Sequence, residues 1–177
     1  TSMRDFEDKI VLVTGASTGL GAALAVGAAA RGAKAVILNY ARSAAEAEAT
    51  AAAVRAAGAE AVLVQGDVSQ DADCRKITDA AAPFGRIDAL ANNAGVTKFA
   101  PKHGDLDALT REDFEHLYAV NVIGPFQMLR ATRPLLEASA RAAVLMVSSI
   151  AGVAGIAEGR PSAIDVEYGA VDIRRVI

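Results

Sequence analysis

Val11-Leu-Val-Thr-Gly-Ala-Ser-Thr-Gly-Leu-Gly21 is the stretch that decides the fold. An apolar run from Ile10 ends abruptly at Thr14, and an alanine-rich stretch after Gly21 closes at Gly32. This order predicts a strand, a tight glycine turn and a helix. Glycine lets the backbone come close to a bulky anion and lets the helix pack tightly on the strand. The helix N–H groups and the positive end of its dipole would then face a pyrophosphate, and Ser17 and Thr18 can add hydroxyl donors.

A glycine turn alone can be a mere connection, so the rest of the chain decides. The 177 residues suggest one domain with a real core, and the formal net charge is −3 without a basic tract. Nucleic acid and anionic membranes are therefore not expected as partners. No apolar run approaches the ~18–20 residues of a membrane span, and the start has no signal-peptide core.

The cysteine and histidine content bears on compartment and metal binding. Cys74 is the only cysteine, which rules out an internal disulfide and fits a reducing cytoplasm. The only histidines are His103 and His116, and the three side chains show no metal-ligand spacing. We therefore expect a cytoplasmic protein without a metal site.

Four further apolar runs alternate with helical patterns. The expected strands are Ala35–Leu38, Ala61–Val64, Ile87–Ala91 and Val144–Val147, the last of them apolar on both faces. The expected helices are Ala44–Ala57, a segment from Ser69 to near Pro83–Gly85, and a long one from Arg111 to about Ala138. Capping signals at Ser43–Glu46, Gly58 and Thr110–Asp113 support these bounds. Such alternation predicts an α/β fold whose parallel sheet is covered on both faces.

Several motifs together resemble one family. Thr14-Gly-Ala-Ser-Thr-Gly-Leu-Gly21 resembles the T-G-x-x-x-G-x-G motif of the short-chain dehydrogenases/reductases, and Asn92-Asn-Ala-Gly95 resembles their N-N-A-G. Asn121, Ser148-Ser149 and the spacing between all four also match, over roughly Lys9 to Ile156. The resemblance implies a Rossmann-type, doubly wound parallel sheet over residues 3–156. It also implies that NAD(H) or NADP(H) exchanges hydride with a small-molecule carbonyl or alcohol.

The end of the second expected strand bears on the choice of cofactor. An acidic residue there would bind the adenosine 2′-hydroxyl of NAD and repel a 2′-phosphate. This chain has Asn39-Tyr-Ala-Arg-Ser43 instead, with no carboxylate and one guanidinium. Because Arg42 can pair with a phosphate dianion, we predict NADP(H), with NAD(H) as the alternative. A plainer interpretation is that Arg42 is a solvated turn residue and Ser43 only caps the next helix.

The resemblance places further cofactor contacts after the third and fourth strands. Asp67 and Val68 correspond to residues that contact the adenine in the family, although a simple turn explains them nearly as well. After the fourth strand, Asn93, Ala94 and Gly95 are expected to lie close to the cofactor, whereas Asn92 can join neighbouring strands through its amide. The expected cofactor-binding residues are Gly15, Ser17, Thr18, Gly19, Leu20, Gly21, Asn39, Tyr40, Arg42, Ser43, Asp67, Val68, Asn93, Ala94 and Gly95.

Two residues are expected to take part in catalysis. Asn121 lies four residues before Pro125, whose missing N–H deprives the Asn121 carbonyl of its helical partner, and Gly124 loosens the turn further. The resemblance implies that this carbonyl holds a water in a proton relay, and a packing kink is the alternative. Ser149 ends the fifth expected strand and corresponds to the family's catalytic serine, which hydrogen-bonds the substrate oxygen.

The family pattern breaks after Ser149. The family's tyrosine, thirteen residues after the serine, and its lysine, four further on, fall at Ser162 and Val166. Neither side chain can serve as the general acid or lower a phenol pKa. Tyr168 lies six residues late, and its i+4 neighbour Asp172 would raise the phenol pKa. We therefore predict little or no turnover. The alternative function is a non-catalytic dinucleotide-binding or partner-binding fragment.

The tail, residues 157–177, is the part in which the family fold is missing or altered. Ile164, Val166 and Tyr168 alternate with acidic residues, which indicates a strand where the family has a helix. Three explanations stay open: a truncated or frame-altered product, a sequence that omits residues, or a fragment whose tail pairs with the bare edge of the fifth strand. Family members often associate through the helix that carries Asn121, so a homo-oligomer also stays open.

Overall fold

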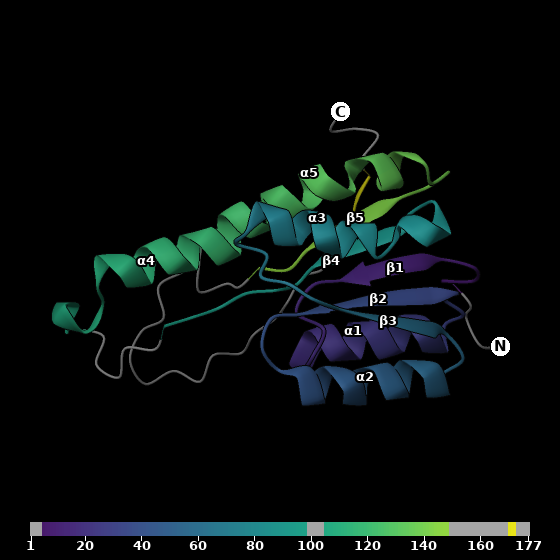
Figure 1. Ribbon diagram of the computed structural model, residues 1–177, viewed down its shortest axis with the longest axis horizontal. Helices are drawn as coiled ribbons and strands as arrows, with labels where there is room; N and C mark the ends of the chain where they lie inside the picture. The colour runs from purple at the N-terminus through teal and green to yellow at the C-terminus, as the bar shows by residue number, and fades with distance from the viewer. Residues whose placement is uncertain (1–4, 99–104, 149–169, 173–177) are drawn as a thin grey trace.

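The computed structural model describes residues 5–98, 105–148 and 170–172. Its sheet has the order β3-β2-β1-β4-β5-β6 (Figure 1). The strands are β1 (Ile10–Val13), β2 (Ala35–Tyr40), β3 (Glu60–Gln65), β4 (Ala89–Asn92), β5 (Ala143–Met146) and β6 (Ala170–Asp172). The first five are parallel, and the chain winds outward from β1 in both directions. The predicted doubly wound, Rossmann-type sheet is thus confirmed.

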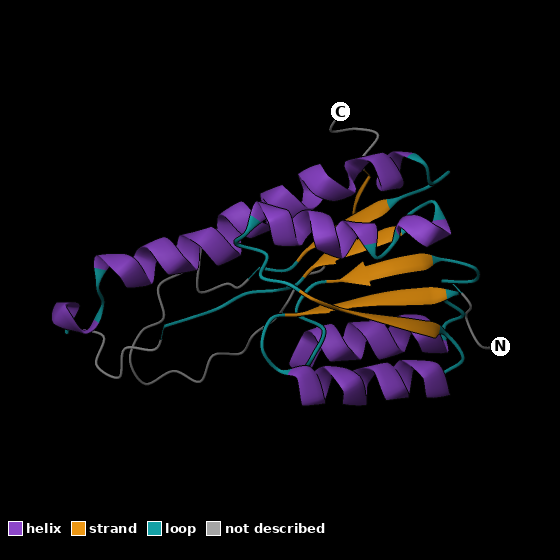
Figure 2. Cartoon of the chain, in the orientation of Figure 1, coloured by secondary structure: helices purple, strands orange, loops and turns teal. Residues whose placement is uncertain are grey.

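Helices cover both faces of the sheet (Figure 2). The helices α1 (Gly19–Ala30) and α2 (Ala44–Ala56) lie on one face, and α3 (Asp71–Asp79) and α5 (Gly124–Glu137) lie on the other. Helix α4 (Arg111–Tyr118) leads through the π-helical turn η3 (Ala119–Ile123) into α5, and this helical run extends past the sheet (Figure 1). Two short 3-10 turns complete the description, η1 (Ala82–Phe84) and η2 (Leu106–Ala108). None of the described helices has both the length and the apolar content to cross a membrane.

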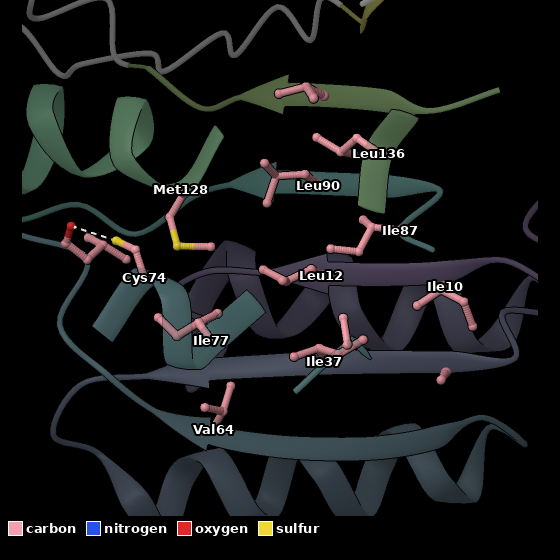
Figure 3. Close-up of a cluster of buried hydrophobic side chains, with 14 of the residues drawn as sticks. Ile10, Leu12, Ile37, Val64, Cys74, Ile77, Ile87, Leu90, Met128 and Leu136 are labelled. Atoms are coloured by element: carbon pink, nitrogen blue, oxygen red, sulfur yellow. Dashed lines mark hydrogen bonds between the residues drawn. The ribbon is translucent and has the colours of Figure 1, made fainter. Parts of the chain in front are cut away.

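Strand β1 shows why the sheet needs helices on both faces. Its alternate side chains enter separate cores, Ile10 and Leu12 on the α3–α5 side and Val11 and Val13 on the α1–α2 side. All four are almost completely buried. On the α3–α5 side, Leu12, Ile37 and Leu90 of the strands meet Ile77 and Met128 of the helices (Figure 3). A strand buried on both faces reads as a continuous apolar run, as Ile10–Val13 does.

The structure corrects three of the predicted elements. Ser43 makes no side-chain hydrogen bond that caps α2, so the expected capping box is absent there. Helix α3 ends at Asp79, earlier than expected, because the chain tightens into η1 around Pro83. Strand β5 is apolar on both faces, with Val144 in the α3–α5 core and Leu145 against the α1–α2 core, but it is Ala143–Met146 rather than Val144–Val147, and its end residue Met146 is 45% exposed. This exposure arises because β5 lies next to the edge of the sheet.

The tail contributes one strand to that edge. Residues Ala170–Asp172 pair antiparallel with β5, so that Ala143 faces Asp172. Of the explanations for the tail, this arrangement agrees with the one in which the tail pairs with the edge of the fifth strand. Ser162, Val166 and Tyr168 lie outside the described residues.

A buried carboxylate joins the amino ends of β1 and β4. Asp88 is 5% exposed and accepts hydrogen bonds from the N–H of Ile10 (2.8 Å), the hydroxyl of Ser139 (2.7 Å) and Nε of Arg86 (3.0 Å). Burial alone would raise the pKa of Asp88, but these three hydrogen bonds and the charge of Arg86 hold the pKa below its usual value. Asp88 therefore stabilises the fold as an anion.

We expect Asp88→Asn to lower the free energy of unfolding by about 2 kcal/mol at neutral pH, because hydrogen bonds to charged groups contribute about 1.5–3 kcal/mol. A lowered folded-state pKa makes this contribution complete above the ordinary carboxyl value of 3.8. It is lost as the pH falls through the folded value. Urea unfolding between about pH 3 and 7 should show the gap to the parent chain narrowing in acid.

The exposed Glu60 provides the control for this prediction, since Glu60→Gln also removes one carboxylate. It should change the free energy of unfolding by no more than about 0.5 kcal/mol. If the difference in the free energy of unfolding between Asp88→Asn and the parent chain stayed constant over this pH range, the stabilising role of the Asp88 charge would be contradicted.

Candidate functional site

A pocket of about 410 Å³ opens at the carboxyl ends of β1, β2, β3 and β4. This is where the winding of the sheet reverses, between β1 and β4, and such positions bind ligands in open α/β sheets. The predicted cofactor residues that line the pocket are Gly15, Ser17, Thr18, Leu20, Gly21, Asn39, Arg42, Ser43, Asp67, Val68, Asn93, Ala94 and Gly95. The predicted residues Gly19 and Tyr40 are not among its lining.

Each of the three glycines in the turn after β1 is required for a structural reason that can be identified. A Cβ on Gly21 would lie 2.2 Å from the carbonyl oxygen of Gly15, so this glycine lets α1 pack against the end of β1. A Cβ on Gly15 would lie 2.9 Å from Cα of Ala94, in the loop after β4. Gly19 has open space around it but a φ of +57°, a conformation that L side chains rarely adopt. Gly15 and Gly21 thus allow close contacts within the chain, and Gly15, with a φ of +64°, shares with Gly19 the backbone conformation that the turn requires.

The start of α1 has the properties of an anion site. Thr18 occupies the N-cap position, but its side chain makes no capping hydrogen bond, and the first turn has no acidic residue. The first N–H groups of a helix have no partner within the helix, and they carry the positive end of its dipole. Leu20 and Gly21, in this first turn, line the pocket. The arrangement fits a diphosphate group.

The ends of β1 and β4 are fastened together by Thr14 and Asn93. The amide of Asn93 donates to the carbonyls of Thr14 (2.9 Å) and Gly15 (3.1 Å). The buried hydroxyl of Thr14 accepts from the N–H groups of Asn93 and Ala94, both at 3.0 Å. The polar side chain of Asn93 is therefore engaged by the protein itself.

Asn92 and Asn39 also use their amides to join elements. The Asn92 amide donates to the carbonyl of Pro125 (3.4 Å) and to Sδ of Met146 (3.3 Å), which links β4 to α5 and β5. Asn39 is 1% exposed, accepts from the N–H of Gly15 (3.3 Å) and donates to the carbonyl of Gly66 (3.0 Å). Asn39 is part of the pocket wall, and its polar atoms hold the ends of β1, β2 and β3 in register.

Arg42 and Ser43 lie together on the pocket wall after β2. Arg42 is exposed, and within the described part of the chain it has no carboxylate partner. The hydroxyl of Ser43 is not used to cap α2. A guanidinium and a hydroxyl that face the same pocket can together bind a phosphate group.

The long helix is interrupted at Asn121, as Pro125 and Gly124 predict. The N–H of Gly124 bonds to the carbonyl of Ala119, five residues back, which makes η3 a π turn. The side chain of Asn121 pairs with the backbone of Val96: Oδ1 accepts from its N–H (2.9 Å) and Nδ2 donates to its carbonyl (2.8 Å). Asn121 thereby fixes the loop after β4 against the helix. The predicted catalytic residue Ser149 lies outside the described residues.

A second link ties the same loop to α4. Lys98 forms a salt bridge with Asp113 (3.3 Å), and Asp113 forms the predicted capping box with Thr110. The backbone N–H of Thr110, and then Lys98, lower the pKa of Asp113. Asp113 thus stays ionised and keeps the loop in place.

Sequence reasoning missed five residues of the pocket wall: Ala41, Gly66, Val96, His116 and Val120. Ala41, Gly66 and Val96 sit within or beside the turns already singled out, so the position of those turns was the available signal. His116 and Val120 lie one helical turn apart on the α4–η3 run, and only the fold brings them to the pocket. Among the described residues, no group of His, Cys, Asp and Glu side chains could hold a metal ion.

The fold and the pocket define a dinucleotide-binding α/β protein of the Rossmann class. Comparison with known proteins gives the family: residues 9–161 match the short chain dehydrogenase family, and the chain belongs to it. It is 41% identical over 163 residues to a Streptomyces violaceoruber protein named granaticin polyketide synthase ketoacyl reductase 2. That match covers 92% of this chain and 61% of the relative.

Solved structures agree with this assignment. A short-chain dehydrogenase/reductase from Burkholderia xenovorans superposes with a TM-score of 0.79 at 38% identity, over 84% of this chain and 62% of that one. A short chain dehydrogenase from Burkholderia cenocepacia in complex with NADP has a TM-score of 0.68 at 36% identity, over 74% and 52%. The chain spans about three fifths of the length of its first relatives.

Proposed function

We propose that this chain is the cofactor-binding part of an oxidoreductase that exchanges hydride between NADP(H) and a small carbonyl or alcohol compound. The observation that carries the proposal is the pocket at the switch point of the sheet, with the uncapped start of α1 on one side and Arg42 on another. NADP(H) in particular is supported by the cofactor present in the Burkholderia cenocepacia relative.

Each part of the pocket suits one part of the dinucleotide. The first N–H groups of α1 would hold the diphosphate, and Arg42 and Ser43 would hold the 2′-phosphate. Asp67 and Val68 would border the adenine, and the backbone from Asn93 to Gly95 would lie along the adjoining ribose. The bound nicotinamide would supply or accept the hydride. Ser149 would hydrogen-bond the substrate oxygen, and the carbonyl of Asn121 would hold a relay water.

The missing tyrosine and lysine lead us to propose that the chain binds the cofactor but turns over little or no substrate. Titration with NADPH and NADH, followed by nicotinamide fluorescence, tests binding, and NADPH oxidation against a panel of ketones tests turnover. We expect saturable binding and no appreciable oxidation. Absence of binding would contradict the proposal, and turnover at the rate of full-length relatives would show that another group replaces the tyrosine. Binding without turnover also fits the alternative, a non-catalytic dinucleotide-binding fragment.

Self-association through the α4–η3–α5 run is a further part of the proposal. Phe114, Tyr118, Val122 and Phe126 follow one another at four-residue spacing and are 49–61% exposed. A row of large apolar side chains in solvent is typical of an interface, and we propose a second copy of the chain as its partner. Light scattering should give at least a dimer, whereas a monomer at every concentration would contradict this part.

A further inference from the structure

Val68, on the pocket wall after β3, is held by two helices at once. Its carbonyl oxygen accepts a hydrogen bond from Nε2 of Gln127 on α5 (3.0 Å) and another from Sγ of Cys74 on α3 (3.2 Å). The dashed line at Cys74 in Figure 3 marks the second bond. Burial, followed by the charges of Asp71, Asp73 and Asp67, raises the pKa of the Cys74 thiol to about 11. The thiol therefore keeps its proton and remains a donor at neutral pH.

Gln127 is an unusual side chain for its position. It is 8% exposed, and two other residues of α5, Met128 and Leu136, belong to the apolar core on this side of the sheet. A buried amide is costly unless it is hydrogen-bonded, and leucine would fill similar space without that cost. The bond to the Val68 carbonyl gives this amide its partner inside the core.

The start of α5 also presses on the side chain of Val68. A Cβ on Gly124 would lie 2.9 Å from Cγ2 of Val68, so the helix and this loop are in direct contact. Three residues later along the same helix, Gln127 donates a hydrogen bond to the backbone carbonyl of Val68. One helix thus sets both the side chain and the backbone of a residue that lines the pocket.

The same helical run fixes the opposite wall. Asn121 in η3 holds both backbone polar groups of Val96, which lines the pocket on the β4 side. The α4–η3–α5 run therefore sets the spacing between the loops after β3 and β4. Any flat group that fits between these loops depends on where this run places Val68 and Val96.

We propose that Gln127 is a positioning residue of the nucleotide pocket, which fixes Val68 so that the loop after β3 fits the base of the bound dinucleotide. The inference rests on the proposed cofactor binding. Gln127 acts through Val68 and makes no contact with the phosphates. Its loss should therefore weaken every ligand that carries the adenine, by the same factor with or without the 2′-phosphate.

The test compares Gln127→Leu with Thr132→Val in calorimetric titrations with 2′,5′-ADP, NADPH and NADH. Thr132 is a matched control because it is fully buried on α5 and donates only to carbonyls of its own helix, Met128 (2.7 Å) and Leu129. We expect Gln127→Leu to raise all three Kd values about three- to tenfold, because the loop after β3 must then be ordered when the nucleotide binds. Thr132→Val should leave them unchanged. Gln127→Met provides a second apolar variant should the leucine variant fold poorly.

Two results distinguish a failure of the positioning role of Gln127 from a failure of the proposed cofactor binding. If the parent chain binds 2′,5′-ADP and the Gln127 variants bind it as tightly as Thr132→Val does, the positioning role is wrong and the proposed function stands. If the parent chain binds none of the three nucleotides, the proposed function fails and the inference falls with it. A change in the ratio of NADPH to NADH affinity in Gln127→Leu would also overturn the inference, because it would place the effect at the 2′-phosphate.

Discussion

A Gly21→Ala variant should lose both stability and cofactor binding. The added Cβ would lie 2.2 Å from the Gly15 carbonyl oxygen, so α1 must move away from the end of β1. Overpacking of this kind costs about 1–3 kcal/mol, which exceeds the gain of up to about 1 kcal/mol from replacing glycine by alanine in a helix. Because the N–H groups of the same helix start would hold the diphosphate, we also expect the Kd for NADPH to rise at least about tenfold.

Gly27→Ala is the matched control, because Gly27 lies on the same helix and a Cβ there meets nothing within 4 Å. This variant should be as stable as the parent chain or more stable by about 0.5–1 kcal/mol, with an unchanged Kd. Urea unfolding and fluorescence titration measure the two effects. If Gly21→Ala matched Gly27→Ala in both measurements, the close packing of α1 against the end of β1 at Gly21 would not matter for stability or for cofactor binding.

Arg42→Ala should change the choice between the two nicotinamide cofactors. A guanidinium that pairs with a phosphate contributes a charge-assisted hydrogen bond, and its loss should raise the Kd for NADPH about ten- to a hundredfold. The Kd for NADH, which lacks the 2′-phosphate, should stay within about twofold. Parallel titrations of the parent chain and the variant with both cofactors measure the difference.

Arg55→Ala removes the same charge elsewhere and serves as the control. Arg55 is exposed on α2 and pairs with Glu48 (2.8 Å), outside the pocket wall. It should leave both affinities unchanged, which would exclude a general effect of net charge. Equal weakening of NADPH and NADH by Arg42→Ala would refute the preference for NADP(H).

The elements that were predictable from sequence are those whose causes are local. The apolar run Ile10–Val13 forms β1 with the predicted bounds. A strand that is buried on both faces consists of apolar residues alone, so the run itself marks where the strand begins and ends. The Thr110–Asp113 capping box formed, since its partners are three residues apart. The interruption at Asn121 followed from Pro125 and Gly124, which act within one turn of the helix.

The parts that were not predictable depend on contacts between distant segments. Asn93 bonds to carbonyls of Thr14 and Gly15, which precede it by 79 and 78 residues. The sequence suggested a strand-joining amide only at Asn92, which does reach Met146 on β5. Ser43 lines the pocket as predicted, but the capping of α2 that its sequence also suggested does not form. His116 and Val120 reach the pocket only because α4 and η3 pass beside it.

The central claim is that a dinucleotide binds with its diphosphate at the start of α1. Titration of the ¹⁵N-labelled chain with NADP⁺, followed by NMR, tests this claim most directly. The amide signals of Leu20 and Gly21 should shift in a saturable manner, together with those of Val68 and Ala94 across the pocket. Saturable binding that leaves the amides of Leu20 and Gly21 unmoved would contradict the claim.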